Sequence, residues 1–127
     1  MDYAIRVTAR DNTEEIKPIT IGPNRKANDK CNERECTAFR SVVASIAWIA
    51  RQVRPGVSYR VSKLQAIAGS GTVKDMKMVN KLLDYMQSTS NVGIHFTSNR
   101  LDWDDMIVLS ISDAFFFNKR ASLSTEN

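Results

Sequence analysis

The chain has 127 residues, a hydrophobic fraction of 43% and a formal net charge of +4, which suffices for one small domain with a core and argues against disorder throughout. It has no run of about 18 apolar residues and no signal-peptide pattern at its N-terminus, so we expect an unsecreted, intracellular protein of the cytoplasm or nucleus that does not span a membrane. The charge is uneven, because residues 37–81 carry eight basic residues and one acidic residue, and this suggests either a surface for a polyanion or a solvated helix face.

The N-terminal part is expected to form a hairpin followed by a loop. Residues 3–8 alternate loosely between polar and apolar types, which predicts a short strand. A turn cluster follows at residues 10–13, and residues 16–21 are a second candidate strand whose Pro18 favours an edge position. The two strands are expected to pair with each other, and residues 22–32 are expected to be an exposed polar loop.

An amphipathic helix over residues 39–53 is the clearest predicted element. Either Thr37 caps its start or the helix begins near Glu33. The Pro55-Gly56 pair ends it, because proline disfavours a helical conformation in the residue before it. Trp48 lies within this apolar helix and is expected in the core, and stacking on nucleotide bases is the alternative. The apolar residues that recur at steps of three and four are Phe39, Val42, Val43, Ile46, Ile49, Ala50 and Val53.

Two further helices are predicted after this one. The first covers residues 58–68 and ends at the glycines of residues 69–71. Thr72 can cap the second, which runs to about Ser88, with Asp75 at the third position to complete a capping box. Its predicted core face consists of Met76, Val79, Leu82, Leu83 and Met86.

The C-terminal part is predicted to contain two strands, at residues 94–97 and 107–112, and a frayed, disordered tail at residues 119–127. The order of elements predicts an α+β fold with an N-terminal β-hairpin, a three-helix cluster and a C-terminal hairpin. We therefore expect four regions. Their bounds are residues 1–36, 37–90, 91–118 and 119–127.

Three segments resemble copia-type LTR retrotransposon polyproteins, in the order in which that family has them. Residues 39–62, which begin Phe39-Arg40-Ser41, are similar to the end of the reverse transcriptase. Residues 73–93 are similar to the helix that follows it, and residues 83–89 with Val92-Gly93 match the end of that helix. Residues 109–114 contain the Ser-Asp-Ala sequence that opens the family's ribonuclease H-like domain. The resemblance implies a thumb or connection region of three helices, followed by the first strand of an incomplete ribonuclease H-like sheet.

The chain also departs from the family's pattern. Gly56 stands where the family usually has Asp, and Ala44 stands where it usually has Gly. The run Phe115-Phe116-Phe117 replaces a mixture of small and polar residues. These departures are typical of a truncated, drifted fragment rather than of an active element.

The resemblance implies no complete active site. Ribonuclease H chemistry uses two divalent ions held by several carboxylates. Asp113 matches the first of these carboxylates, and the family's other carboxylates lie on later elements. Asp104 and Asp105 follow Trp103 rather than the Tyr-x pair of a polymerase centre, and are expected in a solvated turn. We expect no enzyme activity and no cofactor for this chain, whereas the full-length family uses Mg²⁺.

The two cysteines do not predict a metal site. Cys31 and Cys36 are five positions apart, and the single histidine, His95, is distant in the sequence. A zinc site needs about four ligands. Two free thiols in a reducing compartment are therefore expected, with no metal bound.

Binding is the function that such a fragment can retain. In the family this region helps to hold the primer–template duplex, so sequence-independent contacts with the phosphates of an RNA–DNA hybrid or another nucleic acid are expected. The alternatives are a small protein-interaction module and a domesticated partner of an intact reverse transcriptase, neither with a nucleic-acid role. The apolar strand at residues 107–112 and the phenylalanine run also predict self-association. The basic residues assigned to phosphate contacts are Arg51, Arg54, Arg60, Lys63, Lys74, Lys77 and Lys81.

Overall fold

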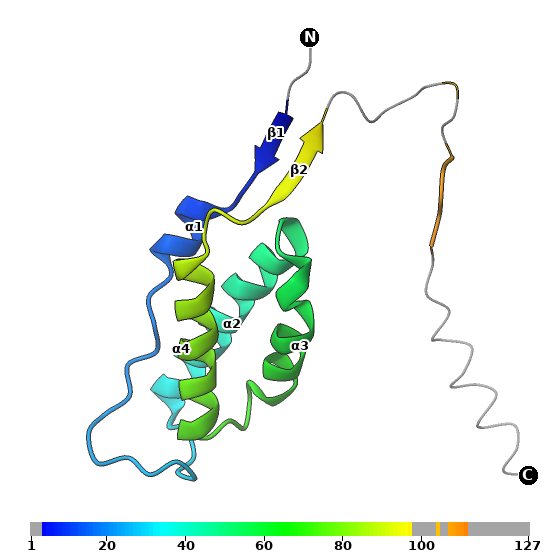
Figure 1. Ribbon diagram of the computed structural model, residues 1–127. Helices are drawn as coiled ribbons and strands as arrows, with labels where there is room; N and C mark the ends of the chain where they lie inside the picture. The colour runs from blue at the N-terminus through cyan, green and yellow to red at the C-terminus, as the bar shows by residue number, and fades with distance from the viewer. Residues whose placement is uncertain (1–3, 98–103, 105–106, 112–127) are drawn as a thin grey trace, which may run out of the picture. The chain divides into compact units, whose positions relative to one another are not determined.

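The fold combines helices with one small sheet, as the α+β prediction required. The computed structural model describes residues 4–97, residue 104 and residues 107–111. The chain divides into two compact units, residues 1–97 and residues 98–127, and the elements named here all belong to the first. In chain order they are β1 (Ala4–Val7), α1 (Arg10–Glu15), α2 (Glu33–Gln52), the short 3-10 helix η1 (Pro55–Val57), α3 (Ser58–Ile67), α4 (Val73–Ser88) and β2 (Ile94–Thr97) (Figure 1).

Helix α2 begins at Glu33, the earlier of the two predicted starting points. The Asn32 side chain accepts a hydrogen bond from the Glu35 N–H at 2.8 Å, and the Glu35 carboxylate accepts one from the Asn32 N–H at 3.4 Å. This reciprocal pair is a capping box, which satisfies two N–H groups that the first helical turn leaves free. The helix ends before Pro55, as predicted, and α3 follows directly after η1.

Helix α4 confirms the prediction made from Thr72 and Asp75. The Asp75 carboxylate accepts hydrogen bonds from the Thr72 N–H at 2.9 Å and from the Thr72 hydroxyl at 3.0 Å. The predicted core face of α4 is buried throughout, at Met76, Val79, Leu82, Leu83 and Met86.

The core of the first unit lies where α2 meets the other helices. Both α3 and α4 pack against α2, and α1 contacts both α2 and α4. Figure 1 shows α4 running alongside α2, with α3 on the other side of the cluster. The largest fully buried side chains include Phe39, Ile46, Ile49, Met76 and Leu83.

The predicted N-terminal hairpin is wrong. Residues 10–13 belong to α1, and residues 16–21 form no strand. Strand β1 pairs instead with β2, antiparallel, with Ile5 opposite Phe96 and Val7 opposite Ile94. The pairing puts these four apolar side chains on one face of the ribbon, because side chains two apart along a strand share a face.

The segment expected as the second strand obtains its hydrogen bonds from α4. The Asn80 side chain accepts a hydrogen bond from the Ile19 N–H at 2.8 Å and donates one to the Ile19 carbonyl at 2.9 Å. The Gln87 amide donates to the carbonyls of Ile16, at 2.9 Å, and Thr13, at 3.2 Å. These side chains supply the backbone with the hydrogen bonds that a neighbouring strand would otherwise provide. Ile19 itself is buried in the core.

The predicted strand at residues 107–112 is also wrong over the part that is described. Residues 107–111 form no strand, and their apolar side chains, at positions 107, 108, 109 and 111, are 80–91% exposed. Ser112, the phenylalanines at positions 115–117 and the predicted tail at residues 119–127 lie outside the described residues.

No helix among the described residues is both long and apolar enough to cross a membrane.

Candidate nucleic-acid interface

A groove of about 850 Å³ lies between α3 and α4. Both helices pack against α2, and the groove runs between them with apolar side chains at its floor. The buried side chains of Leu64 and Leu82 form part of this floor. None of the residues that line the groove is acidic. They are Tyr59, Arg60, Lys63, Leu64 and Ile67 from α3, and Met78, Lys81, Leu82 and Tyr85 from α4.

The two lining sets follow helical spacing. On both helices, every lining residue lies three or four positions from another lining residue. Residues three and four apart share a face of a helix. Each helix therefore presents one stripe that mixes cationic, aromatic and aliphatic side chains toward the groove.

Cations lie over the aromatic rings at the rim. The Lys63 ammonium is 4.8 Å from the centre of the Tyr59 ring, one helical turn earlier on α3. The Arg60 guanidinium is 5.8 Å from the centre of the Tyr85 ring, on the facing helix. Cation–π contacts of this kind hold charged side chains in place at an exposed surface. Both tyrosines remain exposed to solvent, Tyr59 to 71% and Tyr85 to 47%.

A smaller hollow of about 310 Å³ continues the groove toward β2. It shares Arg60 and Tyr85 with the groove and extends past Pro55 and Val57 to Ile94. The shared residues make the two depressions one surface, which we call the α3–α4 track.

Three of the seven predicted basic residues meet in the groove, namely Arg60, Lys63 and Lys81. Arg51, Lys74 and Lys77 are exposed but are not among the residues that line it.

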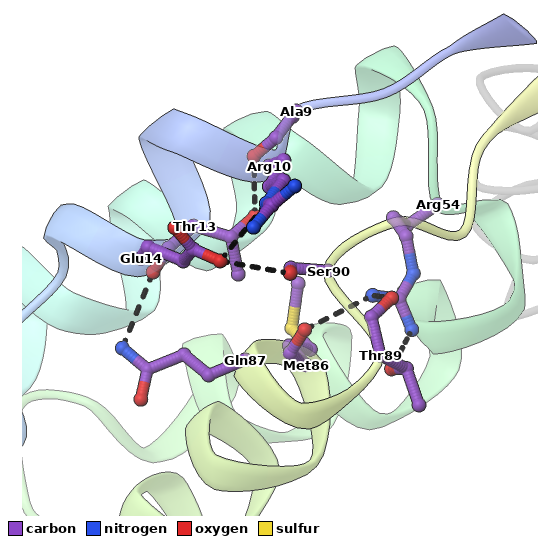
Figure 2. Close-up of polar contacts among 9 residues, drawn as sticks. All are labelled: Ala9, Arg10, Thr13, Glu14, Arg54, Met86, Gln87, Thr89 and Ser90. Atoms are coloured by element: carbon purple, nitrogen blue, oxygen red, sulfur yellow. Dashed lines mark hydrogen bonds and ion pairs between the residues drawn. The ribbon is translucent and has the colours of Figure 1, made fainter.

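Arg54 has a different role from the one expected, because its side chain is structural. It is only 6% exposed. Its guanidinium donates hydrogen bonds to the carbonyls of Met86, at 3.3 Å, and Thr89, at 3.1 Å, and to the Thr89 hydroxyl, at 2.9 Å (Figure 2). It thereby satisfies carbonyl groups that the last turn of α4 leaves free. Although Arg54 borders the smaller hollow, these bonds fix its charged head at the helix end.

Trp48 is not in the core, contrary to expectation. It is 52% exposed on α2 and borders a separate hollow of about 650 Å³ between α1 and α2. Its neighbours along the helix, Ala47 and Ile49, take the buried positions instead.

The residues with possible metal chemistry do not come together in the part of the chain that is described. No group of three or more His, Cys, Asp or Glu side chains could hold a metal ion there. Cys31 and Cys36 are free, and both are partly buried. Asp113, which matches the first ribonuclease H carboxylate, lies outside the described residues, as do Asp102, Trp103 and Asp105.

Tyr59 and Tyr85 were not among the binding residues predicted from the sequence, because that prediction rested on charge alone. The spacing of Tyr59 with Lys63, and of Lys81 with Tyr85, is four residues in each case. An aromatic residue one turn from a lysine on an otherwise exposed face is a pattern that a search for stacking surfaces would have found.

No protein family, curated protein or solved structure matches the chain significantly.

Proposed function

We propose that this chain binds nucleic acid without sequence preference through the α3–α4 track, and that it is a catalytically incomplete piece of a copia-type retrotransposon polyprotein. The observation that carries the binding proposal is the meeting of Arg60, Lys63 and Lys81 around a groove without acidic lining residues. Three neighbouring cations suit successive phosphates of a nucleic-acid backbone, which carry charge but no sequence information.

The origin within a retrotransposon polyprotein is supported by the three motifs in family order, at residues 39–62, 73–93 and 109–114. In that setting the helices would belong to the thumb or connection region and would help to hold an RNA–DNA hybrid. Asp113 would be the first carboxylate of a ribonuclease H-like domain. One carboxylate alone holds Mg²⁺ weakly.

The binding proposal is tested by fluorescence anisotropy with labelled nucleic acid at two salt concentrations. A protein that neutralises three phosphates gives a slope of about −2.1 with a single strand and about −2.7 with a duplex for the logarithm of affinity against the logarithm of salt concentration. Affinity should therefore fall about twenty- to fortyfold between 50 and 200 mM salt. An affinity that does not change with salt would contradict the proposal.

A matched pair of charge-reversal variants locates the site. The double variant Lys63→Glu/Lys81→Glu should lose most of the affinity. Lys17→Glu/Lys26→Glu makes the same change in net charge at two exposed lysines that do not line the groove, and it should cost little. Equal losses in both variants would mean that net charge, and not the track, drives binding.

A second candidate function is the docking of an acidic amphipathic helix from a protein partner. The apolar floor at Leu64, Ile67 and Leu82, with Met78 beside it and cations at the rim, is the composition that such helix-in-groove recognition uses. Tighter binding of an acidic amphipathic peptide than of any nucleic acid, lost in Met78→Glu, would favour this candidate.

A further inference from the structure

We propose that the α3–α4 track takes unpaired nucleotides, with bases stacked on Tyr59 and Tyr85, so that its preferred ligand is a single strand and not the hybrid duplex. This inference rests on the proposed function, since it assigns a ligand class to the same site. It differs from what the family resemblance implies, because a duplex keeps its base faces stacked inside.

The exposure of the two rings is the first argument. Tyr59 and Tyr85 are 71% and 47% exposed, so neither residue belongs to the buried core. Tyr59 has the Lys63 ammonium near its ring, and Tyr85 has two guanidinium groups near its ring, those of Arg60 and Arg54. An exposed ring beside cations combines a surface on which a base can stack with charges that suit the phosphates of the same nucleotide.

The floor of the groove is the second argument. Duplex nucleic acid presents phosphates and groove edges to a protein, and the aliphatic side chains of Leu64 and Leu82 offer these groups no hydrogen bonds. The flat face of an unpaired base is apolar enough to lie against such a floor. The cations at the rim are then placed for the phosphates of the same strand.

The length of the track is the third argument. The smaller hollow shares Arg60 and Tyr85 with the main groove and continues toward Ile94. A strand that follows the track can therefore meet Tyr59 in the main groove and Tyr85 where the two hollows join, beside Arg60. Single-strand binding proteins combine cations along the backbone with successive aromatic platforms in the same way.

The test compares three ligands of equal length with the full chain: oligothymidine, its abasic counterpart with the same phosphates, and an RNA–DNA hybrid. Stacking contributes about 1–3 kcal/mol per base, and about 1.4 kcal/mol corresponds to a tenfold change in affinity. Oligothymidine should bind at least about tenfold more tightly than the abasic strand, and more tightly than the hybrid.

Substitutions assign the effect to the rings. Tyr59→Leu/Tyr85→Leu should abolish the preference for oligothymidine over the abasic strand, whereas Tyr59→Phe/Tyr85→Phe should keep this preference. Trp48→Leu removes a half-exposed aromatic ring that lies outside the track and should change nothing. The single variant Tyr59→Leu, at the more exposed ring, gives the same comparison if the double variant fails to fold.

The outcomes separate this inference from the proposed function. Equal affinity for oligothymidine and the abasic strand, or tighter binding of the hybrid, would overturn the inference and leave phosphate binding in place. If none of the three ligands shows salt-dependent binding, both the inference and the proposed function are wrong. Binding of an acidic amphipathic peptide without binding of any nucleic acid would also reject both the inference and the proposed function.

Discussion

Arg54 links the loop after α2 to the end of α4. Its guanidinium donates hydrogen bonds to the carbonyls of Met86 and Thr89, which follow it by 32 and 35 residues in the sequence. A buried guanidinium is costly to desolvate, and it is tolerated here because its N–H groups meet carbonyl oxygens and a hydroxyl. The Tyr85 ring lies 5.8 Å from the same guanidinium. The end of α4 and the loop after α2 are therefore held together by one side chain.

Arg54→Ala should lower the free energy of unfolding by about 2–4 kcal/mol, because hydrogen bonds to a charged group are lost and the Met86 carbonyl loses its bond from Arg54. Arg54→Lys should recover only part of this, since an ammonium cannot reproduce the planar fork of donors. Urea denaturation followed by circular dichroism measures the difference. Arg51→Ala, an exposed position three residues earlier, is the control and should change stability by less than about 0.5 kcal/mol.

Cys31 offers a test of local burial. Desolvation raises the pKa of the Cys31 thiol above its usual value, and the nearby Cys36 and Glu35 add to the effect. The thiolate is the reactive form, so at pH 8 the folded chain should carry less thiolate at this position than the unfolded chain.

The midpoint of the pH profile for alkylation of Cys31 should therefore lie higher in the folded chain than in denaturant. Iodoacetamide labelling followed by trypsin separates the two thiols, because cleavage after Lys30, Arg34 and Arg40 puts Cys31 and Cys36 on different peptides. Partial burial alone would slow labelling at every pH without moving the midpoint. Coincident midpoints in folded and denatured chains would contradict the raised pKa.

The sequence predicted single residues well where the signal was local. Asn32 was not singled out, but Thr72 and Asp75 were, and both capping boxes depend only on residues three positions apart. Trp48 and Arg54 were misplaced because burial is decided by elements far along the chain. Trp48 occupies the outward side of α2, while Arg54 meets a helix end that no local pattern can reveal.

At the scale of elements, α2, α3 and α4 were predictable from their apolar periodicity, whereas the sheet was not. Strands β1 and β2 were each expected near their observed positions, but the partner of β1 was not. The pattern at residues 16–21 is compatible with a strand, and only the side chains of Asn80 and Gln87 on α4 explain why it forms none.

Asn80 gives the clearest prediction at this scale. Asn80→Leu should leave the buried N–H and carbonyl of Ile19 without partners, at a cost of about 1–3 kcal/mol. Hydrogen exchange should increase at the Ile19 amide while the amides of α4 stay protected. Lys81→Ala, an exposed position on the same helix, is the control. Unchanged exchange at Ile19 would mean that apolar burial alone holds this segment on α4.

At the scale of the whole molecule, the α3–α4 track was only half predictable. Arg60, Lys63 and Lys81 belonged to the predicted basic set, but nothing local indicates that two stripes from separate helices face one groove. That arrangement follows from the packing of both helices on α2. The tyrosines became meaningful only when the groove placed them beside cations.

The division into two units predicts that the first can fold without the second. A chain shortened after Thr97 keeps every named helix and strand, so its helical circular dichroism should be unchanged and its thermal midpoint should stay within about 2 °C.

The shortened chain should also self-associate less than the full chain in sedimentation velocity, because the exposed apolar side chains at residues 107–111 are gone.

The full chain carrying Leu109→Ser and Ile111→Ser is the matched variant, and it should show the same reduction in self-association. A large drop in the thermal midpoint of the shortened chain would instead show that residues beyond Thr97 contribute to its stability.

The pairing of β1 with β2 has a consequence for folding kinetics. Arg6 and His95, which are hydrogen-bonded across the ribbon, are 89 residues apart in the sequence. Closing a long loop costs conformational entropy that grows with its length, whereas the helical cluster assembles through shorter loops. We therefore expect the ribbon to form after the rate-limiting step. A Cβ at Gly93 would overlap the Val7 backbone carbonyl, so Gly93→Ala should raise the unfolding rate in stopped-flow experiments and leave the refolding rate nearly unchanged. A slower refolding rate would place the ribbon in the transition state.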